Sequence, residues 1–371
     1  MWRSDRAGGK RLSVAAVVAA LGVAVAWASP AAGQTTQPPP PKCENFSCQD
    51  PLFTVDYPAK DSMVTSHGVA VHLPAQFYNS KAFLMFGAGD LRFASKLAAG
   101  TGYQPVQTDD GHAIVDLDLN EWDDTNLGPY HEVILIVPVN RGKVVVKGDD
   151  PYQLLGASVD PENPLLTIKL IVDTQLAVDV GREYYHLDKV TTPQVISSDI
   201  APSLARFSVT DPHGHPVLSG SWPIDTGPAA QGDAWSRFSS TPGFGRMIQD
   251  TAIHAGGLTR FGYVYRDVSD PSVIKQAHAA GRVVTDPSQA AIGPRSSDAT
   301  FDVHAGTEFG TLLQETGMNP VLGIVFAGGR WVLANGPAPA TEPGLTSSSN
   351  GTGASSTSGA SSLEEIARLA P

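Results

Sequence analysis

The stretch "HEVILIVPV" at residues 131–139 constrains the fold more than any other part of the chain. It is apolar on both faces of a strand, so it needs cover on both sides and predicts a central strand. The stretch "HAIVDLDLN" at 112–120 instead alternates, with apolar residues on one face and Asp116 and Asp118 on the other. Because consecutive strands usually pair, the two stretches are predicted to form a hairpin.

Other segments also show strand periodicity, which makes the predicted fold mainly β (α+β). They are residues 143–147, 164–172, 205–210, 216–224, 260–267 and 319–335. Helices are expected at 90–100, 173–186 and 270–281, because each begins at a capping aspartate. Pro271 at a first helical position and the glycines Gly100 and Gly281 as stops support two of them. The prediction is a large antiparallel sheet with a few short helices.

The chain ends differ in composition from its middle. Arg3, Arg6, Lys10 and Arg11 precede an apolar run, so residues 1–32 are predicted to be a signal peptide, with an uncleaved anchor as the alternative. Residues 33–50 are a Pro-rich linker. Residues 337–371 are rich in Ser, Thr and Gly and are predicted to be a disordered tail. One β domain is therefore expected over residues 51–336.

Charge and cysteine content narrow the function classes. The formal net charge of −12 argues against nucleic acid and anionic membrane surfaces as partners, apart from a membrane contact through an uncleaved anchor. No motif for a cofactor or spacing for a metal is present, so neither is expected. Cys43 and Cys48 are predicted to form a local disulfide, which fits a secreted or extracytoplasmic protein.

Two carboxylates on the predicted hairpin are candidates for chemistry. If Leu119 faces His131, Asp118 lies opposite Glu132 on the same face. Two carboxylates so placed inside a β structure do not both ionise, so one would hold a proton and act as a general acid. The alternative, favoured for Asp116 and Asp118 on their own, is a solvated strand face.

Lys189 is the last residue but one of the stretch "GREYYHLDKV" at residues 181–190 and has two interpretations. It is either a solvated lysine favoured by the dipole of a preceding helix, or an amine that forms a Schiff base. The second role requires an unprotonated amine, which burial or a neighbouring cation promotes. Candidates for those effects nearby are Arg182, His186, Tyr184, Tyr185 and Leu187.

The ordered combination of these motifs resembles the acetoacetate decarboxylase family. "LGPYHEVILIVPV" contains the family's Tyr-x-Glu in Tyr130 and Glu132, and "DTQLAVDVGRE" contains its Asp-x-x-x-Ala-x-x-x-Gly-Arg-Glu helix. Lys189 stands six residues after Glu183, as the family's Schiff-base lysine does. Asp118 falls near the position of a second acidic residue in the family's pocket. The resemblance is clear over about residues 110–195.

The resemblance implies a cone-like double barrel of curved antiparallel sheet with flanking helices. It also implies a small keto acid as substrate and lyase chemistry, such as decarboxylation, through a Schiff base. Lys189 would be the nucleophile, Glu132 would position substrate or shuttle protons, and Asp118 would assist it. Supporting or substrate-binding residues would be Tyr130, Arg182, Glu183 and His186, and the chain could form a homo-oligomer.

Three departures from the family pattern keep a second function open. Asp188 and Val190 stand where the family has proline and a second lysine, and the region "QFYNSKAF" has Asn79 near the expected place of a substrate-binding arginine. The alternative is therefore a protein that binds a small apolar or carboxylated ligand on the same scaffold without turnover.

Overall fold

The computed structural model describes residues 38, 40–191, 196–211, 213–253, 258–282 and 290–337. The predicted signal peptide and most of the predicted tail lie outside these residues. No helix within the described part of the chain is both long enough and apolar enough to cross a membrane.

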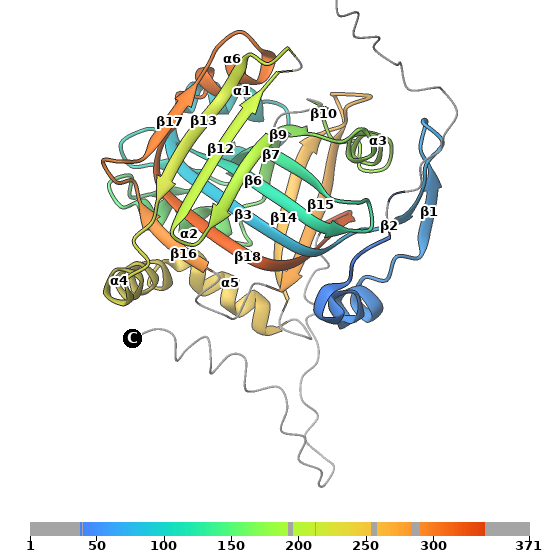
Figure 1. The fold of residues 1–371 in the computed structure, drawn as a ribbon. Coiled ribbons are helices and arrows are strands. Elements are labelled where there is room, and N and C mark those ends of the chain that lie inside the picture. Colours follow the sequence, from blue (N-terminus) through green and yellow to red (C-terminus); the bar gives the residue numbers. More distant parts are fainter. Residues whose placement is uncertain are drawn as a thin grey trace, which may run out of the picture. The chain divides into compact units, whose positions relative to one another are not determined.

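Seven strands close into a barrel (Figure 1). Around the barrel each strand pairs with the next, and the last pairs with the first. All neighbours are antiparallel except the third and fourth strands of this circuit, which are parallel. The order is β6 (Ala113–Thr125), β7 (Tyr130–Asn140), β9 (Leu165–Val172), β14 (Thr259–Arg266), β15 (Ile274–Arg282), β18 (Asn319–Asn335) and β3 (Ala75–Gly89). The mainly β fold expected from the sequence is thus confirmed.

A second sheet of four strands covers one wall of the barrel. It consists of β11 (Ile196–Ala201), β12 (Leu204–Thr210), β13 (Pro216–Pro223) and β17 (Thr300–Val303). Phe207 and Trp222 of this sheet pack on Phe83 of β3, with ring centroids 5.9 and 6.0 Å apart. Leu117 of β6 and Val133 of β7 lie in the same core. The apolar outer face of the barrel is therefore buried, as the prediction of β7 as a central strand requires.

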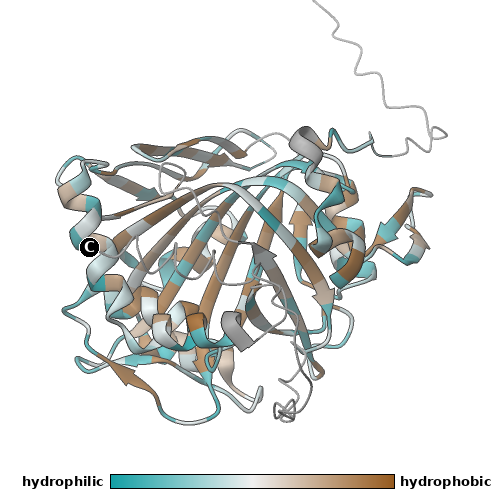
Figure 2. Ribbon diagram, turned by 90° about the horizontal axis from the view of Figure 1, so that it is seen from below, coloured by the Kyte–Doolittle hydropathy of each residue, from teal (hydrophilic) through white to brown (hydrophobic). Residues whose placement is uncertain are grey.

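Helices cover other parts of the barrel. α2 (Pro151–Val159), α4 (Pro228–Ser239) and α5 (Pro242–Ile253) lie together, and α2 packs on β3, β6 and β18. α1 (Leu91–Ala98) begins where predicted, because the Asp90 carboxylate accepts hydrogen bonds from the backbone N–H groups of Arg92 and Phe93. α6 (Glu308–Glu315) packs on β13 and β17. In Figure 2, brown segments alternate with teal and white ones along the barrel strands.

Shorter elements complete the fold. A 3₁₀ turn at Glu44–Gln49, a π turn at Leu52–Asp56 and the hairpin β1 (Asp61–Val64) and β2 (Ala70–Leu73) come before the barrel. The short strands β4 (Gln104–Pro105), β5 (Gln107–Thr108), β8 (Val145–Val146), β10 (Lys189–Thr191) and β16 (Ala290–Pro294) extend the main sheet.

The helix predicted at 270–281 is wrong, because most of that segment is strand β15. Asp270 does bind the backbone N–H groups that follow it, but it closes a turn and starts no helix. Its carboxylate accepts a hydrogen bond from the Ser272 N–H, and its carbonyl accepts one from the Val273 N–H. The chain then enters β15, which pairs with β14 and β18 on either side. An aspartate followed by proline starts turns as well as helices, and tertiary pairing decided the outcome here.

The helix predicted at 173–186 exists as α3 (Gln175–Glu183), but its cap differs from the expected one. Thr174 occupies the position before the helix, and its side chain makes no capping hydrogen bond. The Asp173 carboxylate instead accepts hydrogen bonds from the backbone N–H and the Nδ1 of His131 on β7, at 2.9 and 2.6 Å. This contact raises the pKa of His131 and ties the start of α3 to the barrel.

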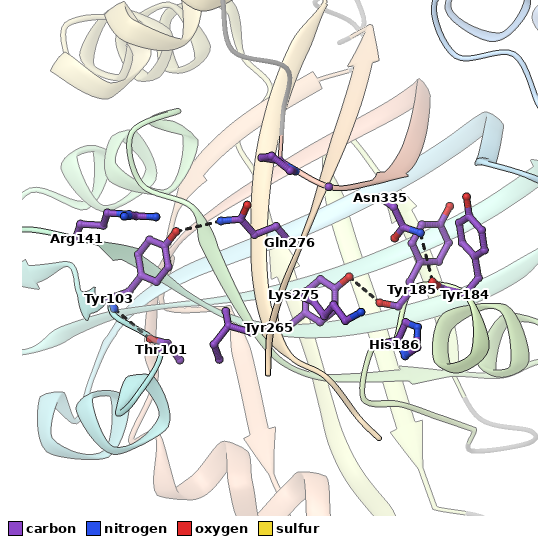
Figure 3. Close-up of a pocket in the computed structure, with 13 residues that line it drawn as sticks. Thr101, Tyr103, Arg141, Tyr184, Tyr185, His186, Tyr265, Lys275, Gln276 and Asn335 are labelled. Carbon is purple, nitrogen blue, oxygen red and sulfur yellow. Dashed lines mark hydrogen bonds between the residues drawn. The ribbon is translucent and has the colours of Figure 1, made fainter. Parts of the chain in front are cut away.

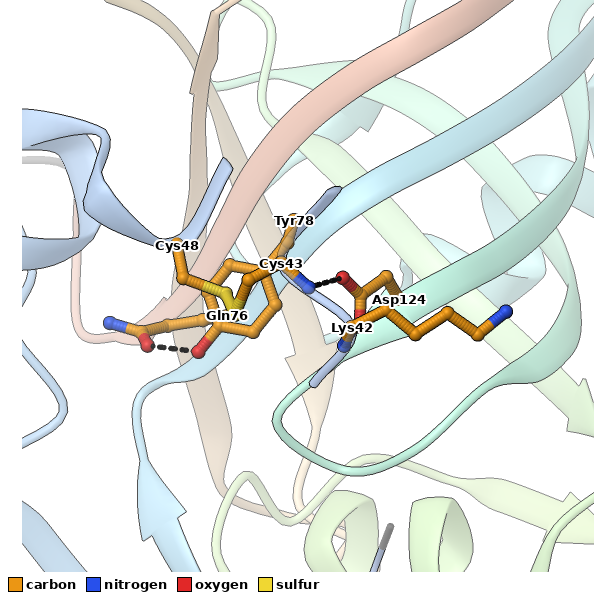
Figure 4. The surroundings of a disulfide bond; sticks show 6 residues. All are labelled: Lys42, Cys43, Cys48, Gln76, Tyr78 and Asp124. Carbon is orange, nitrogen blue, oxygen red and sulfur yellow. Dashed lines mark hydrogen bonds between the residues drawn. A yellow bond between two sulfur atoms is a disulfide. The ribbon is translucent and has the colours of Figure 1, made fainter. Parts of the chain in front are cut away.

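The predicted disulfide joins Cys43 to Cys48, with their Cα atoms 5.1 Å apart (Figure 4). Beside it, the Asp124 carboxylate accepts hydrogen bonds from the backbone N–H groups of Lys42 and Cys43. The disulfide therefore closes a small loop that is itself bound to the end of β6.

We expect the double variant Cys43→Ser with Cys48→Ser to lower the free energy of unfolding by about 2 kcal/mol, because so short a loop restricts the unfolded chain only modestly. Urea denaturation without reductant measures this difference. With excess dithiothreitol the two proteins should unfold at the same midpoint. A difference that persists under reduction would show that the serines, and not the lost crosslink, are responsible.

Candidate functional site

The polar face of β6 points into the barrel. Leu117 and Leu119 lie in the outer core beneath the four-stranded sheet, so Asp116 and Asp118, which alternate with them, face the interior. They are 2 % and 6 % exposed. The interpretation of this face as solvated was therefore wrong.

The register of β6 against β7 differs from the expected one by two residues. Glu132 lies opposite Asn120, and Asp118 lies opposite Ile134, whereas Leu119 had been expected to face His131. A shift of two residues keeps every side chain on its own face of the sheet. Asp118 and Glu132 thus share the interior face, although they are not directly opposite each other.

Lys189 lies in the barrel interior. It opens β10, which runs parallel to β9 with Lys189 opposite Leu170. The residue is 4 % exposed, and its Nζ forms an ion pair with Oε2 of Glu132, which is 5 % exposed. Nζ also lies 5.5 Å from the centre of the Tyr130 ring. Lys189 is therefore not a solvated lysine at a helix end.

Gly181 on α3 makes room for the Lys189 side chain. A Cβ at Gly181 would lie 2.7 Å from Cδ and 3.2 Å from Cβ of Lys189. The turn after α3 returns the chain directly beside the helix, because the Leu187 N–H donates to the Gly181 carbonyl. The glycine of the Gly-Arg-Glu motif thus has a steric role that its sequence position alone did not reveal.

Asp188 does not pair with the neighbouring lysine in the sequence. Its carboxylate binds Nζ of Lys169 on β9 at 2.7 Å, and Glu308 on α6 binds the same ammonium at 3.0 Å. Lys169 lies on the face of β9 opposite to Leu170, because side chains alternate along a strand. The Asp188 carboxylate is therefore directed to the outer face of the barrel.

Asp116 and Asp118 share a hydrogen bond in the interior. Burial raises the pKa of Asp118 to about 7, the hydrogen bond with Asp116 lowers it, and the charge of Glu132 raises it. Burial and the charge of Asp118 raise the pKa of Asp116 well above its ordinary value. The raised pKa of Asp116 favours its protonated form, which donates a hydrogen bond to Asp118, and Asp118 exchanges a proton near neutrality.

Aromatic side chains surround these polar groups. Trp122 lies 6.3 Å from Tyr130 between ring centroids, and Phe261 lies 5.9 Å from Trp331. Tyr263 on β14 packs with the same interior cluster, and burial and then the charges of Asp118, Asp116 and Glu132 raise its pKa. Trp122, Phe261, Tyr263 and Trp331 are only half-buried although they pack with the interior cluster. Aromatic side chains therefore line the face of the barrel that carries the carboxylates.

Three predicted supporting residues lie away from Lys189. Arg182 and Glu183 are exposed on α3, and the Glu183 carboxylate accepts hydrogen bonds from the Ser66 backbone N–H. His186 lines a separate cavity of about 590 Å³, to which neither Lys189 nor Glu132 contributes. Figure 3 shows His186 on one side of this cavity, with Tyr103 and Arg141 on the other. The structure thus brings together Lys189, Glu132 and Tyr130, with Asp118 on the same interior face.

Comparisons with known proteins identify similar solved structures. No family model and no curated protein matches the chain. An acetoacetate decarboxylase from Legionella pneumophila is similar at 10 % identity and a TM-score of 0.48, over 72 % of this chain and 88 % of that one. An acetoacetate decarboxylase-like enzyme from Sphingomonas wittichii RW1 is similar at 10 % identity and a TM-score of 0.39, over 71 % and 92 %.

The enduracididine biosynthesis enzyme MppR is similar at 12 % identity and a TM-score of 0.38, over 71 % of this chain and 89 % of that one. Its structure holds the condensation product of pyruvate and imidazole 4-carboxaldehyde. Two of these three proteins carry the family name that the motifs around Tyr130 and Lys189 resemble. At such identities and TM-scores, the similarity transfers no activity to this chain.

Proposed function

We propose that this protein is an exported enzyme that forms a Schiff base between Lys189 and a small carbonyl compound, and thereby carries out carbon–carbon lyase chemistry. The observation that carries the proposal is the burial of Lys189 against Glu132 on the interior face of the barrel. A buried lysine beside a carboxylate has both an amine to react and a group to accept its proton.

The proposed reaction begins with proton transfer from the Lys189 ammonium to Glu132. The free amine adds to the carbonyl carbon, and the carbinolamine takes the proton back from Glu132 and loses water to give an iminium ion. The iminium nitrogen then takes up the electron pair of a breaking C–C bond, so that CO₂ leaves from a keto acid and an enamine remains. Protonation of the enamine carbon and hydrolysis then return Lys189. The Asp116 and Asp118 pair holds protons at neutral pH for these steps.

The family resemblance favours a small keto acid as the carbonyl compound, decarboxylation as the reaction, and export as the location. Export is supported further by the basic and apolar N-terminal sequence and by the Cys43–Cys48 disulfide, which is typical of oxidising compartments.

A second candidate function is ligand binding without turnover. The ion pair of Lys189 with Glu132 favours it, because an ammonium has no lone pair with which to attack a carbonyl. The two functions differ in whether a covalent imine forms.

Borohydride reduction distinguishes the two candidates. The protein is incubated with a panel of aldehydes, ketones and α- and β-keto acids and then reduced, and its intact mass is measured. The proposal predicts a single adduct whose added mass equals that of the ligand, or of its cleavage product, less one oxygen. An unchanged mass with every compound, despite ligand-induced changes in tryptophan fluorescence, would support binding without turnover.

Gly181→Ala is expected to reduce the rate of adduct formation at least tenfold, because the new Cβ displaces the Lys189 side chain. Folding stability should change by no more than about 1 kcal/mol, since alanine favours a helix over glycine and offsets part of the strain. Gly245→Ala on α5 is the matched control, because no atom lies within 4 Å of its new Cβ. Equal rates in both variants would contradict the steric role of Gly181.

A further inference from the structure

The barrel interior is acidic. Asp116, Asp118 and Glu132 all face it and are at most 6 % exposed, and Lys189 is the cation that pairs with one of them. Among the described residues, no other lysine or arginine forms an ion pair with these three carboxylates. The cations on neighbouring strands pair elsewhere: Lys81 with Glu121, Lys169 with Asp188 and Glu308, and Arg330 with Asp50.

Polar atoms on the same face have unused hydrogen-bonding capacity. Oδ1 of Asp116 and Oδ1 of Asp118 are buried and have no hydrogen-bond partner among the described residues. The Trp122 indole N–H, on the same face of β6, is likewise buried without an acceptor. Buried polar groups are normally hydrogen-bonded, so these atoms suit a ligand that both donates and accepts. Within the part of the chain that the structure describes, no group of His, Cys, Asp and Glu side chains is arranged as a metal site.

We propose that this interior accepts carbonyl compounds that carry a hydrogen-bond donor and excludes those that carry a carboxylate. The proposal keeps the imine chemistry proposed above, on which it rests for the position of the carbonyl group, and replaces the keto acid by a neutral carbonyl compound. Lys189 balances the charge of Glu132, so a ligand carboxylate would meet the uncompensated charge of ionised Asp118 at low effective dielectric, where repulsion between charges is far stronger than in water. A neutral amide or hydroxyl group can instead donate to the unpartnered carboxylate oxygens.

This inference changes the reaction expected at Lys189. Decarboxylation needs a carboxylate in the interior, whereas aldol cleavage does not. In aldol cleavage, a base removes the proton of the β-hydroxyl group of the iminium adduct. The C–C bond then breaks, its electron pair moves into the iminium to give an enamine, and an aldehyde leaves. Asp118, which exchanges its proton near neutrality, is placed on the right face to act as that base.

Acetoacetate and acetoacetamide provide the test, because they share a ketone and differ in a carboxylate against a carboxamide. Adduct formation is followed by borohydride reduction at a series of ligand concentrations, with methyl acetoacetate as a neutral compound that has no N–H donor. We expect half-maximal labelling by acetoacetamide at a concentration at least about tenfold lower than by acetoacetate, with the ester between them. Asp118→Asn, which removes one ionisable carboxylate, should narrow the difference between the half-maximal concentrations of acetoacetamide and acetoacetate.

The possible outcomes separate this inference from the proposed function. Labelling by acetoacetate at an equal or lower concentration than by acetoacetamide would overturn the charge selection and leave the imine chemistry intact. If none of the three compounds labels the protein, the imine proposal fails for them. The preference for acetoacetamide over acetoacetate is then tested as reversible binding, without borohydride, by tryptophan fluorescence. Tighter binding of acetoacetamide would still support the selection, and equal or weaker binding would overturn it.

Discussion

Replacing Lys189 with methionine is expected to lower the free energy of unfolding by about 3–5 kcal/mol at neutral pH, with no ligand present. Glu132 is 5 % exposed, and the Lys189 ammonium is its ion-pair partner. Without that ammonium, a carboxylate stays buried among apolar side chains such as Ile134 and Leu170. Such a loss should lower the melting temperature by on the order of 10 °C.

A double-mutant cycle isolates the ion pair from other effects of the substitution. Lys189→Met combined with Glu132→Leu replaces both charges by apolar groups and should recover most of the lost stability. Lys189→Met, Glu132→Leu and the double variant are each compared with the wild type by urea denaturation. A single variant as stable as the wild type, or a double variant no more stable than the single one, would contradict the assignment of Lys189 and Glu132 as a buried pair.

Asp118→Asn is expected to remove a pH dependence from folding stability. Burial raises the pKa of Asp118 to about 7, so between its ordinary value near 4 and pH 7 the folded protein holds a proton that the unfolded chain has released. Stability therefore falls as pH rises through this window, because the native state binds more protons than the unfolded state. The change is on the order of a few kcal/mol for this group.

The asparagine variant should be less sensitive to pH between 4 and 7, and more stable than the wild type at pH 8, because its amide has no charge to bury. It should also catalyse more slowly if Asp118 exchanges protons with the substrate. Urea denaturation at pH 5, 6, 7 and 8 measures the first effect. Asp302→Asn, at an exposed position on β17, is the control and should follow the wild type. If the free energy of unfolding changes with pH in the same way for Asp118→Asn and the wild type, the raised pKa of Asp118 is contradicted.

Most of the fold was predictable because its strands are long and strongly patterned. The apolar runs at 131–139 and 164–172 became the central strands β7 and β9. The helix predicted at 270–281 failed because alanine-rich strand residues and helix residues look alike when no alternation separates them. Only the pairing of β15 with β14 and β18 distinguishes the two.

The site was predictable in its members but not in its geometry. The spacing of Lys189 from Gly-Arg-Glu identified the lysine, but only the structure places its amine beside Glu132. In the sequence, Asp188 counted against a reactive Lys189 because it stands next to it. Neighbours in sequence need not share a face, however, and the structure directs the Asp188 carboxylate to Lys169.

The alternating strand 112–120 shows a second limit of sequence patterns. Alternation predicted one buried and one solvated face, and its apolar face is indeed buried beneath the four-stranded sheet. Its other face is buried as well, because the sheet closes into a barrel. Closure depends on the pairing of β6 with both β3 and β7, which no local pattern in the sequence specifies. Asp116 was therefore missed as a member of the site.

The most direct test of the account is to locate the reduced adduct in the chain. Wild-type protein, Lys189→Met and Lys169→Met are each incubated with a carbonyl compound that labels the wild type, reduced with borohydride, digested and analysed by mass spectrometry. Lys169 is the matched control, because it is equally buried and also paired with carboxylates. The account predicts the adduct on Lys189 in the wild type and in Lys169→Met, and no adduct in Lys189→Met. An adduct on another lysine, or one that persists in Lys189→Met, would contradict it.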